Sequence, residues 1–175
     1  TIKSLKKIAA AAERRGPHAF GFAWIDRNGR MHSYKQAGRI SLHLDLIDQM
    51  AGAKAVIGHT RFATHGSIED NINNHPHACD GGWIVHNGIV SNYAELIQQH
   101  RLLPQSRCDS EVLGLLIARL KGSLLRRVSR TVNMVSQDAP LCMAGIWNRP
   151  NRVILVRRGN PLFVSRGRKG NMYFS

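Results

Sequence analysis

The chain has 175 residues, of which 43% are hydrophobic and 21% are charged. This balance is typical of a globular protein and excludes a largely disordered one. The sequence has no run of eighteen apolar residues, so it predicts no membrane span, and its basic amino terminus lacks the apolar centre of a signal peptide. Its three cysteines, Cys79, Cys108 and Cys142, form no CxxC pair, which suits a reducing compartment, so we expect a cytoplasmic protein.

The charge is strongly positive. Lysine and arginine number 25 against 11 aspartates and glutamates, giving a formal net charge of +14, and the cations cluster at 119–130 and 157–169. Clustered cations favour a nucleic acid or another polyanion as partner, because binding releases counterions from the phosphates. A solvated basic surface, or a subunit that docks an acidic protein, explains the same composition. No aromatic stacking pattern separates these alternatives.

The first half of the chain predicts a helix followed by strands. Apolar residues recur at helical spacing over 1–15, and strands are expected at 19–26 and 31–37. Arg27-Asn28-Gly29-Arg30 between them is typical of a hairpin turn, because Asn and Gly tolerate positive φ. A short helix is predicted over 42–50, and buried strands that lead into loops are predicted over 54–63 and 82–90.

The second half predicts three helices and then strands. The helices are expected at 92–103, 110–120 and 124–135, with Ser91 and Asn92 offering capping oxygens to the first. The strands are expected at 141–147, 152–157, 162–165 and 172–174. Because helices and strands come in blocks and not in strict alternation, the order favours an α+β fold over a doubly wound parallel sheet.

Three segments carry candidate chemistry. Arg61 follows a buried strand, where a guanidinium can hold a carboxylate through two parallel hydrogen bonds. In Asn87-Gly88 the side-chain amide and the next backbone N–H can converge on an oxyanion. Asp109, at the start of an apolar helix, can pair with an ammonium group. Each has an ordinary alternative, since the arginine can fix its own loop, Asn-Gly can be a turn, and the aspartate can be a helix cap.

Five histidines lie within thirty residues, at positions 59, 65, 75, 77 and 86. Imidazoles of His75 and His77 can bind zinc with Cys79 or Asp80 as a further ligand. Neither a helical i, i+4 histidine pair nor a CxxC arm is present. We therefore expect the histidines to hydrogen-bond loops around a pocket, with no metal and no cofactor.

Together these segments resemble the glutaminase domain of class II glutamine amidotransferases, the N-terminal-nucleophile type. The resemblance covers nearly the whole chain, 1–175, which it implies is a single glutaminase-type domain. The matching segments are Arg15-Gly16-Pro17 with Gly21, His59 to Gly66, Asn74-His75-Pro76-His77, Val85 to Val90 with Asn92, Asp109-Ser110-Glu111, and Arg158-Gly159-Asn160-Pro161-Leu162.

The resemblance implies a four-layer αββα sandwich and a glutamine site. Glutamine would place its α-carboxylate on Arg61 and its α-ammonium on Asp109, with Thr64, His65 and Gly88 completing the hold. Asn87 and the Gly88 N–H would form the oxyanion hole. The loop over 61–66 would close over the substrate and exclude water.

The family reaction uses an N-terminal cysteine, and the sequence departs from the pattern there. By comparison, the opening strand with this nucleophile should stand roughly ten positions ahead of Thr1. Thr1 itself leads straight into a helical pattern and is disfavoured as the nucleophile. A second departure is His18-Ala19, where relatives carry Asp and Ser.

Three functional classes follow. The first is a glutaminase whose cysteine lies before Thr1 and whose ammonia passes to a separate acceptor domain or subunit. The second is a nucleophile-free glutamine-binding or structural subunit. The third is a nucleic-acid-associated module built on the same fold.

Overall fold

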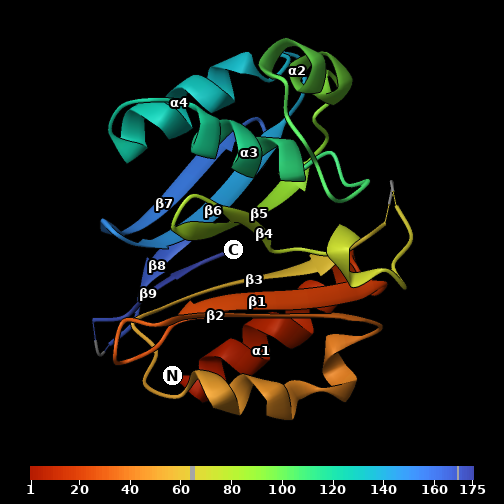
Figure 1. Cartoon of the computed structure of the whole chain (residues 1–175). Coiled ribbons are helices and arrows are strands. Elements are labelled where there is room, and N and C mark those ends of the chain that lie inside the picture. The colour runs from red at the N-terminus through yellow and green to blue at the C-terminus, as the bar shows by residue number, and fades with distance from the viewer. Residues whose placement is uncertain (64–65, 169) are drawn as a thin grey trace.

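The protein, described here from a computed structural model for residues 1–63, 66–168 and 170–175, is built of four layers in the order helix, sheet, sheet, helix (Figure 1). The first helical layer holds α1 (Ile2–Ala12), continued by a 3₁₀ turn over Glu13–Arg15, and the 3₁₀ segments Ile40–Leu42 and Leu44–Met50. The first sheet has the order β2-β1-β3, with β1 (Ala19–Ile25) between β2 (Met31–Ala37) and β3 (Ala55–Arg61). Both pairings are antiparallel.

The sequence of β1 explains why two layers can pack on this sheet. All seven of its residues are buried. Phe20, Phe22 and Trp24 point toward the first helical layer, where they join one apolar cluster. Ala23 and Ile25 belong to a second cluster that lies between the two sheets. Because side chains alternate across a strand, large residues fill the helix side while smaller ones let the second sheet approach.

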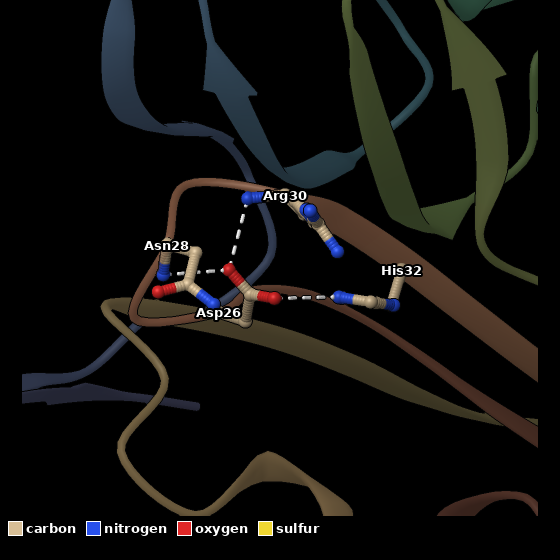
Figure 2. A network of polar contacts seen from close by, with 4 residues as sticks. All are labelled: Asp26, Asn28, Arg30 and His32. Atoms are coloured by element: carbon tan, nitrogen blue, oxygen red, sulfur yellow. Dashed lines mark hydrogen bonds and ion pairs between the residues drawn. The ribbon is translucent and has the colours of Figure 1, made fainter.

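The β1–β2 hairpin is closed by one carboxylate (Figure 2). Asp26 Oδ1 accepts hydrogen bonds from the N–H groups of Asn28 and Arg30, at 2.8 and 2.9 Å, and Oδ2 lies 3.0 Å from His32 Nε2. The hydrogen bond with His32, then those with the two amides, lower the pKa of Asp26. The aspartate thus fixes the turn that the Asn-Gly pair predicts.

The second sheet has the order β4-β5-β6-β7 and is antiparallel. Its strands are β4 (His77–Cys79), β5 (Gly82–Gly88), β6 (Leu141–Asn148) and β7 (Asn151–Arg158). The outer helices α2 (Tyr93–His100), α3 (Glu111–Arg119) and α4 (Leu124–Met134) cover its far face (Figure 1). Their apolar sides meet Ile84, Met143 and Trp147 in the largest cluster. A small separate hairpin, β8 (Val164–Arg166) with β9 (Met172–Phe174), follows β7.

The α+β class and the four-layer αββα sandwich are confirmed, and most predicted elements are present with shifted ends. The helix expected at 42–50 is 3₁₀ and not α-helical, and the one expected at 92–103 ends at His100. The strand expected at 162–165 begins only at Val164. β4 and a 3₁₀ turn at Asn71–Asn73 have no counterpart in the predictions. Within the described ranges, no helix is long and apolar enough to cross a membrane.

Candidate active site

A cavity of about 510 Å³ opens where β3 and β5 end, between the two sheets. Four of the predicted site residues line it, Arg61, Asn87, Gly88 and Asp109, together with the adjoining Phe62. The volume lies within the range of small-molecule pockets. The structure therefore brings the candidate cation, oxyanion donors and carboxylate to one place. Thr64 and His65, the other two predicted contacts, lie outside the described residues.

Arg61 is the last residue of β3 and is buried, with 4% of its surface exposed. Its guanidinium donates to Asn74 Oδ1 at 2.7 Å and to the Gly66 carbonyl at 3.3 Å. Asn74 is itself fully buried. These bonds hold the cation at the cavity wall. They also show that Arg61 stabilises its own loop, as the alternative interpretation of the sequence had it.

The backbone around Arg61 is fixed from the other side by the segment before β1. A side chain at Gly16 would place its Cβ 2.5 Å from Arg61 C and from Thr60 O, so only glycine permits this approach. The His18 N–H donates to the Arg61 carbonyl at 3.1 Å, and His18 Nδ1 accepts from Ala63 N–H at 3.1 Å. The His18 ring also lies against Phe62, with centroids 4.6 Å apart. The departure at His18 therefore has a structural role, which the sequence did not predict.

Asp109 lies just before α3, and its side chain contacts the loop that follows β5. It is buried, and its Oδ2 accepts from the Val90 N–H at 2.6 Å. The next residue, Ser110, places its hydroxyl 2.9 Å from His86 Nδ1. Asp109 is thus a buried carboxylate fixed by the β5 loop, within the cavity wall.

Asn87 and Gly88 end β5 on the same wall. Asn87 is exposed, and its backbone carbonyl accepts from Asn160 Nδ2 at 3.0 Å. Gly88 has φ +146, and a Cβ there would lie 2.5 Å from the Pro140 carbonyl and 2.8 Å from His86 Nε2. Glycine is required at this position, because a side chain would clash with Pro140 and His86 and would strain the backbone.

Buried histidines form the floor beside these residues. The rings of His59 and His75 lie 4.1 Å apart, and those of His75 and His77 lie 4.7 Å apart. Burial is the first cause that lowers the pKa of each, to about 3 at His77, where nearby Lys35 adds to the effect. Burial also lowers the pKa of His59 and of His86, although Asp109 opposes the shift at His86. The cluster is therefore neutral at pH 7.

The sequence suggested Cys79 or Asp80 as a zinc ligand beside His75 and His77. In the structure neither of them lies in a potential ligand group with these two histidines. Asp80 is exposed and pairs with Arg127 at 2.8 Å. The third residue beside the two histidines is Cys108, which lies more than thirty positions along the chain from His77. No spacing pattern could have identified it.

The three thiols are reduced, and two of them, Cys108 and Cys142, line the cavity. Burial raises the pKa of Cys108 and Cys142, and raises that of Cys79 to about 12. Because the thiolate is the nucleophilic form, these environments disfavour all three as nucleophiles.

No family model matches the chain, but curated proteins and solved structures are similar to it. The chain is 36% identical over 185 residues to glutamine–fructose-6-phosphate aminotransferase of Aquifex aeolicus, covering 98% of this chain and 30% of that protein. It is 36% identical over 162 residues to the enzyme of the same name from Symbiobacterium thermophilum, covering 89% of this chain and 26% of that protein. The chain thus spans less than a third of these curated relatives.

Two solved structures share the fold. One is the allosteric regulatory enzyme of purine biosynthesis, with a TM-score of 0.77, 21% identity, and coverage of 95% of this chain and 37% of that one. The other is glutamine phosphoribosylpyrophosphate amidotransferase from B. subtilis, with a TM-score of 0.75, 21% identity, and coverage of 99% and 38%. At this identity the likeness supports the fold.

Proposed function

The chain belongs to the class II, N-terminal-nucleophile glutamine amidotransferases, and from this premise we propose that it is a glutaminase domain that hydrolyses glutamine to glutamate and ammonia. The observation that carries the proposal is the convergence of Arg61, Asn87, Gly88 and Asp109 on one cavity. A guanidinium and a carboxylate suit the two charged groups of a free amino acid, and the Asn-Gly pair suits its reacting amide.

In this proposal each group has a distinct task. Arg61 binds the α-carboxylate, Asp109 binds the α-ammonium, and Gly88 leaves room for the substrate beside the main chain. Thr64 and His65 complete the hold on the amino-acid end. Arg61 and Asp109 are buried and held by hydrogen bonds, so their orientation costs little entropy when glutamine binds.

The reaction is an acyl transfer to a cysteine thiolate. The sulfur attacks the side-chain carbonyl carbon, and the oxygen that becomes negative is stabilised by the Asn87 amide and the Gly88 N–H. The cysteine's own α-amine transfers a proton to the leaving nitrogen, so ammonia departs and a thioester remains. Water then attacks the thioester, giving glutamate and the free thiol. The ammonia passes to a separate acceptor domain or subunit.

We propose that this cysteine begins an extended segment ahead of Thr1, which completes the glutaminase domain formed by residues 1–175. Beside β3 lies a second, apolar cavity of about 110 Å³, lined by α1, β9 and alternate β3 residues such as Val56, Gly58 and Thr60. It shares Gly58, His59 and Thr60 with the larger cavity, so the two cavities adjoin along β3. Ten extended residues span roughly 33 Å, which is enough to follow β3 into the larger cavity.

The nucleophile is tested by intact mass and amino-terminal sequencing of the protein from its own cells. The expected result is an amino-terminal cysteine, with ammonia released from glutamine and abolished by Cys→Ala at that position. A mature amino terminus without cysteine, together with no ammonia release, would favour the nucleophile-free glutamine-binding subunit instead.

The pocket is tested separately by three substitutions in the active protein. Arg61→Lys and Asp109→Asn should raise KM for glutamine by about tenfold or more, because each removes a charge-assisted contact. Asn87→Ala should lower kcat by about 10²-fold or more, as expected for a lost oxyanion donor. Asp80→Asn, an exposed carboxylate beside Arg127, is the matched control and should change neither. Parent-like KM values in the first two variants would refute the assignment.

We propose in addition that the basic surface at the end of α3 and the start of α4 binds a polyanion, with nucleic acid as the partner. Arg119, Lys121, Arg126 and Arg130 are all exposed there, in the outer helical layer (Figure 1). Electrophoretic mobility shifts over a salt series test this. Arg126→Glu with Arg130→Glu should abolish binding, whereas Arg152→Glu on β7 should reduce it less. No shift even at low salt would refute nucleic acid and leave an acidic protein as the partner.

A further inference from the structure

The floor of the large cavity contains a second set of potential ligands. The imidazoles of His75 and His77 and the thiol of Cys108 each offer one ligand atom, and these atoms all lie within 4.8 Å of one another. All three residues are buried, with 4%, 3% and 6% of their surfaces exposed. His75 and Cys108 line the cavity, so the group is reachable from solvent.

Several nitrogens in this group lack a hydrogen-bond partner in the described part of the chain. They include both ring nitrogens of His75 and Nε2 of His77. A buried polar atom without a partner costs free energy, so clusters of them are uncommon unless something binds there. Two neutral imidazoles aimed at a thiol form a typical zinc-binding set.

We propose that His75, His77 and Cys108 bind a zinc ion, with the fourth position open to the cavity. The nitrogen and sulfur donors suit Zn²⁺, which prefers three protein ligands and a water at an open site. On binding, Cys108 loses its proton to solvent, and the thiolate forms the Zn–S bond. The ligand atoms lie within 4.8 Å of one another, so binding requires the three side chains to move closer to tetrahedral separations.

The charges around the site fit a divalent ion. The carboxylate of Asp109 lies 3.9 Å from Cys108 Sγ, so thiolate and carboxylate together balance two positive charges. The metal in turn offsets the repulsion between these two anions. Arg61 and Lys35, which act on the same histidines, oppose the ion, and the Asp109 carboxylate offsets their charge. This site does not depend on the proposed glutaminase activity.

The test is zinc binding by the intact protein that carries this chain, after removal of metal with a chelator. Titration of Zn²⁺ against a chromophoric chelator should show one tight site per chain. Co²⁺ in place of zinc should show a sulfur-to-cobalt charge-transfer band and tetrahedral d–d absorption. Cys108→Ser and His77→Gln should weaken zinc binding by about tenfold or more and remove or alter the bands.

Cys142→Ser is the matched control, because Cys142 also lines the cavity but does not belong to the group. It should bind zinc as the parent does. If Cys108→Ser fails to fold, zinc protection of Cys108 from iodoacetamide, measured by mass spectrometry on the parent, replaces it. Equal zinc affinity in Cys108→Ser and parent, no tight site in the parent, or no protection of Cys108 would overturn the proposal.

Discussion

Arg158, the last residue of β7, hydrogen-bonds several backbone carbonyls of a neighbouring segment. Its guanidinium donates to the carbonyls of Val132, Val135, Ser136 and Ala139, at 2.7 to 3.3 Å. These carbonyls belong to the end of α4 and the loop that leads into β6. Arg158 thus satisfies the helix terminus from a neighbouring strand.

Replacing Arg158 with Lys should lower the free energy of unfolding by about 1–3 kcal/mol. The lysine ammonium is a single point and cannot reach carbonyls spread around a planar fork. Urea unfolding measures the effect. Arg157→Lys, one residue earlier and exposed, is the matched control and should change stability by less than about 0.5 kcal/mol. Equal losses in the two variants would contradict the prediction.

Some site residues could be predicted from the sequence because they are charged or polar residues beside apolar segments. Arg61 and Asn87 each follow an apolar segment and Asp109 precedes one, and all three line the cavity. Asn74 and His18, which fix the Arg61 loop, were not identified as its partners. Their bonds depend on how two distant segments approach one another, and no local pattern encodes that distance.

At the scale of elements, α3 lies unusually close to β4. A Cβ at Gly114 would come within 2.6 Å of the Ala78 carbonyl and 3.4 Å of Cys79 Cβ. Glycine in a helix costs about 1 kcal/mol relative to alanine, so its presence here indicates that close packing outweighs helix propensity. The approach of α3 also places Asp109 and Ser110 beside β5.

Gly114→Ala should therefore destabilise the protein by about 1–3 kcal/mol, although alanine is the better helix former. Ala118→Gly, on the exposed side of the same helix, changes helix propensity without changing packing. It should lower the free energy of unfolding by about 1 kcal/mol. Thermal unfolding of both variants measures the difference. A stabilised Gly114→Ala protein would show that α3 can move away from β4 without cost.

Element types followed from periodicity wherever a segment was long. The hairpin turn at 27–30 correctly predicted the two strands that flank it, β1 and β2. β4 was missed because three residues after Pro76 are too few to show alternation. The segment at 44–50 reads as helix by its apolar spacing, and the difference between 3₁₀ and α-helix depends on packing against α1.

At the scale of the whole molecule, the two sheets meet over buried neutral histidines. His75 lies just before β4 and His77 is its first residue, while His59 lies on β3 and His86 on β5. Burial lowers their pKa values, so the folded protein keeps them neutral well below the pH near 6.5 where unfolded histidine takes up a proton. Folding stability therefore depends on pH.

In metal-free protein the contribution of these histidines to the free energy of unfolding should level off near pH 7.5, and it should fall as the pH drops from about 6.5 toward 4. The unfolded state binds more protons in this window, so each histidine contributes a slope of up to about 1.4 kcal/mol per pH unit. Urea unfolding at pH 7, 6 and 5 measures the slope. His77→Gln should reduce this slope by up to about 1.4 kcal/mol per pH unit, the contribution of one proton. A stability independent of pH in this range would contradict the prediction.

The outer edge of β3 has a practical consequence for handling the protein. β3 pairs with β1 on one side, and no strand among the described residues pairs with its other side. A sheet border that keeps its main-chain donors and acceptors available is a template for another chain. Protein in which nothing covers this border should accordingly self-associate or aggregate through it as its concentration rises, and added peptide of matching apolar pattern should restore monodispersity.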